Sequence, residues 1–228
     1  ALNAVVNDNT RLINLAGDLP SFAYTGAWYA NGALHISSPA DTLKCDLSLQ
    51  KIMDDGNRMA LSLQANAANN KINTSLQWDD NSTEKHMSGN LNAIVELYRN
   101  LLNKSEAHVR VLPSHIILGN ATWNLEPSDV IYAENRLLVD HFSVNRGAQH
   151  IIIDGIASNN DTDTLAVDLN EVEVDYILDL VNFHSVEFSG KATGRATATS
   201  LFGKFAPAAD LQVSDFKFEQ GRMGVLAA

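Results

Sequence analysis

The sequence has few basic residues, a single cysteine and no long apolar run, and each shortage argues against a class of protein. Its 16 Lys and Arg against 27 Asp and Glu give a formal net charge of −11. Such a chain has no basic stripe with which to displace phosphate counterions, which argues against a nucleic-acid partner and against an anionic membrane surface. The one cysteine excludes an internal disulfide framework. No apolar segment approaches the ~20 residues of a membrane-spanning helix.

What the sequence has in abundance is alternation of apolar and polar residues. In LKCDLSLQ the apolar positions are Leu43, Cys45, Leu47 and Leu49, and the same period of two recurs along the chain. This period predicts β-strands with one apolar and one polar face. Polar turns such as Asn69-Asn70 recur about every 10 to 14 residues, which predicts a meander of consecutive antiparallel strands.

Four places interrupt this alternation. The apolar phase slips by one between Leu169 and Val172 and again between Val213 and Phe216, which predicts a β-bulge or a bend at each. Helical spacing favours a short helix in Ala93–Glu106, with a strand that fades into a loop as the alternative. A second short helix is predicted in Val174–Phe183.

Two acidic clusters in the sequence are candidates for a metal site or a catalytic site. Asp161-Thr162-Asp163 resembles part of a calcium loop but lacks its glycine and bidentate glutamate, so a solvated turn is the better interpretation. Glu171, Glu173 and Asp175 share one strand face and are interpreted as a water-facing acidic edge.

No motif of an enzyme active site is present in the sequence. The seven histidines show no zinc-ligand spacing, and an enzyme would need a pocket that joins Glu171, Asp175 and His184 or a similar set. Gly190 and Gly194 lie in a strand pattern without the Gly-Lys-Ser/Thr ending of a phosphate loop. We therefore predict no enzymatic activity, no cofactor and no metal.

Several segments together resemble the carboxy-terminal region of TamB-like proteins, within the AsmA-like group of Gram-negative bacteria. The segments are IIIDGIAS, DTDTLAVDL, VDYILDLV, VEFSGKATGRATA and FAPAADLQV, in the family's order. SHIILGNATWNLEP and the hairpin NNKINTSLQWDDNSTEKHMSGNL precede them. The likeness covers roughly residues 60–228, and it is the order of these weak motifs that carries it.

The resemblance implies a fold and a setting. The implied fold is mainly β: a curled antiparallel sheet, described as a β-taco or half-open barrel, with an apolar inner groove. The implied function is shielding or conducting lipid across the periplasm, by a non-catalytic segment of a translocation and assembly protein. Its partners would be phospholipid acyl chains and a BamA-like outer-membrane barrel, with the parent chain anchored in the inner membrane.

On this interpretation residues 1–228 form one elongated β domain, excised from a longer chain, with a sub-boundary near 103–108. The candidate groove-lining residues are the apolar members of the alternating strands: Leu43, Cys45, Leu47, Leu49, Leu61, Leu63, Leu76, Ile151, Ile153, Leu165, Val167, Leu169, Phe188, Leu211 and Val213.

Two alternatives stay open at the level of sequence. A sealed β-sandwich would produce the same alternation, with the same residues packed as an ordinary core. A binding or adhesion module for a glycan or a protein would instead use exposed aromatic side chains such as Trp28, Tyr24 and Tyr29. Cys45 is interpreted as a small apolar strand residue, with a reactive or metal-binding thiol as the alternative.

Overall fold

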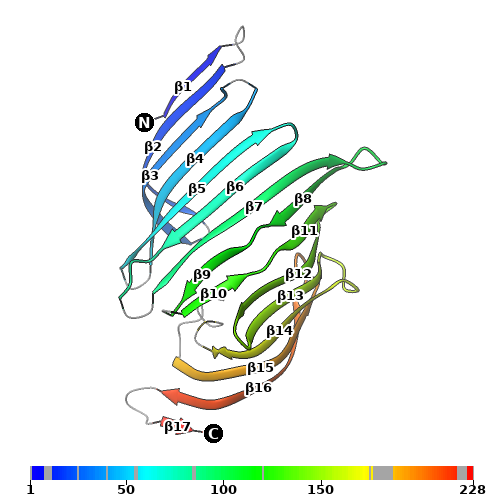
Figure 1. Ribbon diagram of the computed structural model, residues 1–228. Helices are drawn as coiled ribbons and strands as arrows, with labels where there is room; N and C mark the ends of the chain where they lie inside the picture. Colours follow the sequence, from blue (N-terminus) through cyan, green and yellow to red (C-terminus); the bar gives the residue numbers. More distant parts are fainter. Residues whose placement is uncertain are drawn as a thin grey trace. The chain divides into compact units, whose positions relative to one another are not determined.

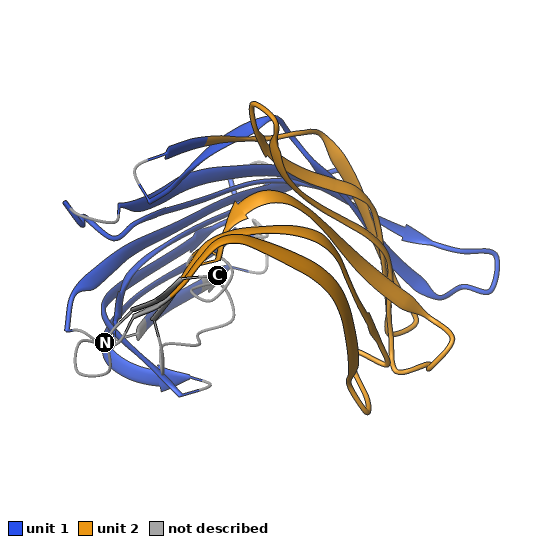
Figure 2. Ribbon diagram, turned by 90° about the horizontal axis from the view of Figure 1, so that it is seen from below, with its two compact units in different colours: residues 1–122 blue, residues 123–228 orange. Residues whose placement is uncertain are grey.

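A computed structural model describes residues 2–7, 12–24, 26–39, 41–53, 56–83, 86–119, 121–174, 176, 187–219 and 225–227. These residues form antiparallel, curled β-sheet almost throughout, which confirms the predicted mainly β fold (Figure 1). The chain divides into two compact units, unit 1 over 1–122 and unit 2 over 123–228 (Figure 2). The region 103–108, where a sub-boundary was predicted, lies inside unit 1, where it covers the end of a turn and the first residues of a strand.

Unit 1 is a meander in which consecutive strands pair. Its first seven strands are β1 (Leu2–Asn7), β2 (Leu12–Tyr24), β3 (Ala27–Ser37), β4 (Leu43–Ile52), β5 (Arg58–Ala68), β6 (Lys71–Asp79) and β7 (Met87–Arg99). β7 also pairs with β8 (Ser105–Val111) along its second half and with β9 (Ser114–Leu118) along its first. Asn69 and Asn70 have φ of 52° and 62°, the positive values that a two-residue hairpin turn requires.

Unit 2 continues the same kind of meander. β10 (Ala121–Leu125) leads into it and is followed by β11 (Ser128–Ala133), β12 (Arg136–Arg146), β13 (Gln149–Ala157), β14 (Thr164–Glu173), β15 (Glu187–Thr199), β16 (Ala206–Glu219) and β17 (Val225–Ala227). β10 and β11 both pair with β12, and each later strand pairs with the next.

Both predicted slips of the apolar phase are irregularities in strand pairing. The register of β14 on β15 shifts between Leu169 and Val172, where Glu171 has φ of 49°. The register of β15 on β16 shifts beside Gly190, opposite Asp215, which has φ of 52°. A bulge inserts one extra residue, so the apolar side chains on both sides of it stay on the same face of the sheet.

The helix predicted in Ala93–Glu106 is wrong. Residues 93–99 belong to β7, where Val95 pairs with Ile72 on one side and with Val109 on the other. The helical spacing was accidental, because the turn residue Leu101 supplied part of it and that side chain is fully exposed. Pairing on both edges decides for the strand over local propensity. Of the second predicted helix, Val174–Phe183, all but residues 174 and 176 lies outside the described residues.

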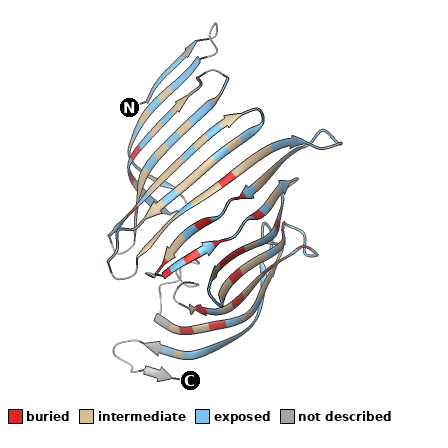
Figure 3. Ribbon diagram, viewed as in Figure 1, coloured by how far each residue is buried: buried red, intermediate tan, exposed pale blue. Residues whose placement is uncertain are grey.

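The two units differ in how deeply their apolar side chains are buried. Buried positions are concentrated in unit 2, whereas β2 to β6 of unit 1 are mainly intermediate or exposed (Figure 3). The largest fully buried side chain is Trp123, whose ring meets Tyr176 edge-on with the ring centroids 6.3 Å apart. Val172 is also fully buried. Unit 2 therefore has a packed core, and unit 1 relies more on the hydrogen bonds of its sheet.

Two glycines of unit 2 differ in what a larger side chain would cost: at Gly147 it would strain only the backbone, and at Gly194 it would also overlap the next strand. Gly147 has φ of 62° and open space around it, whereas Gly194 has φ of 139° and a Cβ there would lie 2.2 Å from the Asp210 carbonyl oxygen. We expect Gly147→Ala to lower the free energy of unfolding by about 1 kcal/mol. Gly194→Ala should lower it by about 3 kcal/mol or more, because strain and overlap combine. Urea denaturation measures both, and equal losses would contradict this account.

Candidate functional site

The apolar side chains of unit 1 form continuous rows across its strands. The register places Leu34, Leu47, Leu63, Leu76 and Leu91 side by side on β3 to β7. Because successive side chains point to opposite faces, the rows two residues away on each strand lie on the same face as this one. We call this the apolar face of unit 1.

The predicted groove residues of unit 1 all lie on this apolar face. Leu49 pairs with Leu61, and Cys45 lies between Ile36 and Ala65. All of them are half-buried except Leu43, which is exposed: Leu43, Cys45, Leu47, Leu49, Leu61, Leu63 and Leu76. The position of Cys45 within an apolar row agrees with its interpretation as a small apolar strand residue.

In unit 2 the predicted residues also share a face, and their exposure changes across the sheet. Ile151 pairs with Leu169, and further along the same strands Ile153 pairs with Val167. Ile151 and Leu169 are buried, whereas Ile153, Leu165 and Val167 are half-buried. On β16, Leu211 is 39% exposed and Val213 is 38% exposed. Phe188 pairs with Phe218 in the register, but its side chain lies outside the described part of the structure.

Several residues of the apolar face were not among the sequence candidates. Leu34 and Leu91 extend the leucine row at both ends, and the alternation of their own strands is the signal that points to them. Trp78 lies over Gly89: a Cβ on Gly89 would be 2.4 Å from the indole ring and 2.9 Å from Ile116. The glycine thus makes room for the indole, a contact that only the pairing of β6 with β7 reveals.

The sheet of unit 1 is a single layer in the part of the chain that the structure describes. Every described strand of this unit belongs to one hydrogen-bonded sheet, in which it pairs with its neighbours. No leucine of the row from Leu34 to Leu91 is fully buried. This arrangement differs from a sandwich, in which inward leucines from two sheets interdigitate and lose nearly all exposure.

Two hollows lie over the opposite face of unit 1. The larger has a volume of about 770 Å³ and the smaller about 420 Å³. On β9 the larger hollow is lined by His115 and Ile117 but not by the intervening residue, and these two pair with Asn90 and Ser88. The hollows therefore open on the side of the hydroxyl and amide side chains, which we call the polar face of unit 1.

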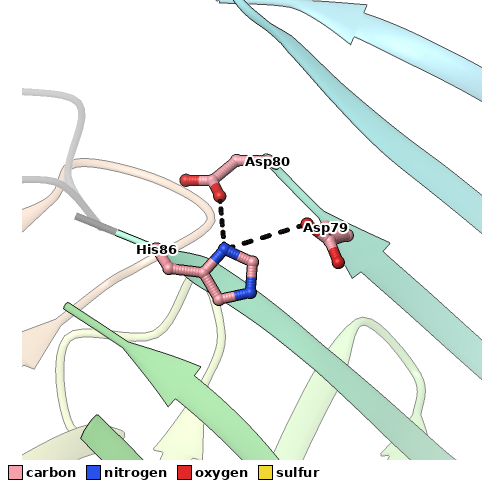
Figure 4. A group of neighbouring side chains, drawn as sticks. All are labelled: Asp79, Asp80 and His86. Carbon is pink, nitrogen blue, oxygen red and sulfur yellow. Dashed lines mark ion pairs between the residues drawn. The ribbon is translucent and has the colours of Figure 1, made fainter. Parts of the chain in front are cut away.

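A group of two carboxylates and an imidazole lies where β6 ends and β7 begins (Figure 4). The Nδ1 atom of His86 is 3.2 Å from Oδ1 of Asp80 and 3.9 Å from Oδ1 of Asp79. Sequence analysis treats this segment as a polar turn and misses the group, because strand pairing is what brings residues 79 and 86 together.

The three donor atoms of this group would suit a divalent cation, but the two carboxylates already stabilise the turn. Oδ1 of Asp80 accepts hydrogen bonds from the main-chain N–H groups of Ser82 and Met87, both at 3.0 Å. Oδ1 of Asp79 accepts one from Asn81 at 2.7 Å. Main-chain N–H groups of a turn need such acceptors, so we assign the group to the structure of this turn.

An exposed arginine of β12 forms an ion pair with a buried carboxylate in the aspartate-rich turn between β13 and β14. Asp163 is only 9% exposed and accepts two hydrogen bonds from the Arg136 guanidinium, at 3.0 and 2.9 Å. The buried Ser158 hydroxyl donates a third at 2.7 Å. These bonds, that from Arg136 above all, lower the pKa of the Asp163 carboxyl. The interpretation as a solvated turn therefore fails for Asp163, although Asp161 is exposed.

The remaining candidates for chemistry do not form a described site. Glu171 is exposed at the bulge of β14, and Glu173 is half-buried. Asp175 and His184, the other members of the only enzyme-like set that the sequence offers, lie outside the described residues.

Comparisons with protein-family models, with curated proteins and with solved structures find no match to this chain. In the described part of the chain, no helix has the length and hydropathy needed to cross a membrane.

The Asp163 ion pair makes a prediction for acid stability. Because its pKa is lowered in the folded state, its contribution to stability is present above the unfolded pKa of about 4 and is lost as the pH falls through the folded value. Asp163→Asn should therefore destabilise the protein at pH 7, and the difference from the unmodified protein should shrink in acid. Urea unfolding at the two pH values measures this. The matched control is Asp161→Asn in the same turn, and an equal loss in that variant would refute the assignment.

Proposed function

We propose that this chain shields hydrocarbon chains of lipid from water on the apolar faces of its sheets, without catalysing a reaction. The observation that carries the proposal is the leucine row of unit 1, which lies on one face of the sheet and is only half-buried at every position. An apolar face whose side chains stay partly exposed is a binding surface or a liability for aggregation. An acyl chain is a ligand that removes such a face from water without needing specific hydrogen bonds.

The dimensions of the leucine row suit an acyl chain. With neighbouring strands about 4.8 Å apart, the four spacings from Leu34 to Leu91 cover about 19 Å. One leaflet of a bilayer, half of a hydrocarbon core of about 30 Å, accommodates an acyl chain in about 15 Å. At about 0.8 kcal/mol per buried CH₂, full burial of a fourteen-carbon chain would contribute on the order of 10 kcal/mol.

Unit 2 supports the same function at its last described strands. Leu211 and Val213 on β16 leave more than a third of their surface exposed, whereas Leu169 in the same row as Leu211 is buried. The apolar face of unit 2 thus passes from packed core at β14 to open surface at β16. We infer that β16 belongs to the lipid-shielding surface and that β13 and β14 stabilise the fold.

The cellular setting of the proposal follows from the resemblance to TamB-like proteins. We propose a periplasmic segment of such a protein, with the parent chain anchored in the inner membrane and a BamA-like outer-membrane barrel as its partner. A net charge of −11 favours interaction with the hydrocarbon chain over interaction with an anionic headgroup. Lipid shielding by the sheet itself can be tested without that setting.

The experiment compares two aspartate substitutions on neighbouring residues of β5 that point to opposite faces. Leu63→Asp introduces a charge at the centre of the leucine row, and Gln64→Asp introduces the same charge on the polar face. We expect Leu63→Asp to weaken binding of cis-parinaric acid at least tenfold, because burying an unpaired carboxylate costs several kcal/mol. Gln64→Asp should bind like the unmodified protein. Fluorescence titration gives the affinities, and circular dichroism checks that both variants stay folded.

Absence of fatty-acid binding by the folded, unmodified protein would contradict the proposal, and so would equal binding by the two variants. Mass spectrometry of an organic extract of the purified protein provides an independent readout. Phospholipid should be present in the extract of the unmodified protein and depleted in that of Leu63→Asp.

A further inference from the structure

The two hollows of unit 1 form one trough across the polar face. Both are lined by Ser48 and Ser62, so the smaller hollow over β2 to β5 continues into the larger one over β3 to β9. Most of the strands contribute three consecutive residues to the lining, as in Ser48-Leu49-Gln50. The side chain of the middle residue points to the apolar face, so its main chain forms the floor of the trough. The trough thus presents side chains from many strands to one elongated ligand.

The middle of the trough is a row of hydroxyl and amide side chains. The register places Ser48, Ser62, Gln77, Asn90 and His115 side by side from β4 to β9, about 4.8 Å apart. Among the described residues, the side chains of the first three have no hydrogen-bond partner. Their donors and acceptors are therefore available to a ligand. A row of hydroxyl and amide groups at a regular spacing suits a polymeric ligand whose polar groups recur from one unit to the next.

The charge of the trough selects against anionic ligands. None of its lining residues is Lys or Arg, and its ionised groups include the carboxylates of Asp18, Asp46 and Asp79. A phosphate, sulfate or uronate group would meet repulsion from these carboxylates, and the guanidinium of Arg58 beside the larger hollow already donates a hydrogen bond to Gln50. The lining therefore matches a ligand that is neutral and hydrogen-bonds through many groups.

An exposed aromatic ring lies beside the trough on the same face. Trp28 is 58% exposed and pairs with Ile52. Ile52 lies two residues along β4 from Gln50, which lines the larger hollow, so both point to the polar face. Gln50 is held in place there, since its Oε1 accepts hydrogen bonds from Asn31 and Arg58 at 2.9 and 3.0 Å. A flat apolar ring next to oriented amides is the combination that recognises a molecule with both hydroxyl groups and an apolar face.

We propose that the polar face of unit 1 binds a neutral oligosaccharide. Sugar hydroxyls exchange hydrogen bonds with Ser62 and Gln77 in the trough, and the C–H face of one sugar ring packs on Trp28. This site goes beyond the lipid-shielding function, because it uses the opposite face of the sheet. Trp28 is one of the aromatic residues on which the sequence-based alternative of a glycan-binding module rests. The trough places a polar binding site next to it.

The test measures binding of two neutral hexasaccharides, maltohexaose and the β-1,4 hexamer of N-acetylglucosamine, by isothermal titration calorimetry. Gln77→Ala removes an exposed amide inside the trough, and Asn73→Ala removes an exposed amide from the same face of the same strand outside it. We expect Gln77→Ala to weaken binding about fivefold, as the loss of one hydrogen bond does, and Asn73→Ala to leave it unchanged. Trp28→Ala should weaken binding by at least a similar factor.

Three results would overturn the proposal: no binding of either hexasaccharide at millimolar concentration, equal losses in Gln77→Ala and Asn73→Ala, or equally tight binding of polygalacturonate, an anionic saccharide. Both amides are exposed, so neither substitution threatens the fold, and circular dichroism confirms this. The Leu63→Asp variant provides a further check. It should lose fatty-acid binding but keep oligosaccharide binding, so a failure of one proposal is distinguishable from a failure of the other.

Discussion

The alternation of side chains along antiparallel strands is the constraint on which the rest of this structure depends. Each strand sends every second side chain to the same face, and the register of each pair aligns those side chains with the next strand. A slip of one residue between β4 and β5 would place Leu47 opposite Ser62 and mix the two faces. The backbone hydrogen bonds and the segregation of leucine from serine and glutamine therefore stabilise the same register.

This constraint gives unit 1 two faces of opposite chemistry on one layer of backbone. The leucine row and the row from Ser48 to His115 are adjacent residues on the same strands, separated only by the thickness of the sheet. The lipid-binding and saccharide-binding sites that we propose therefore lie on opposite sides of the same strands.

Unit 2 shows how the same pattern can yield a core instead. The bulge at Glu171 brings Val172 onto the face of Leu169, and Val172 is fully buried, as is Trp123. Small residues on β15, among them Ala192 and Gly194, allow the main chain of β16 to approach closely. Burial then decreases toward β16, where Leu211 is exposed. Buried and open apolar surface therefore coexist within a single alternating pattern.

The sequence by itself determined the strands, their turns and both phase slips, because period-two alternation, Asn69-Asn70 and the slip at Leu169–Val172 are local signals. It also placed the predicted apolar candidates of unit 1 on one face. Tertiary structure alone decided that 93–99 is a strand, since pairing with β6 and β8 overrides a helical spacing, and that Asp163 is buried against Arg136. It also decided that hollows lie over the polar face, because curvature is a property of the whole sheet and of no single strand.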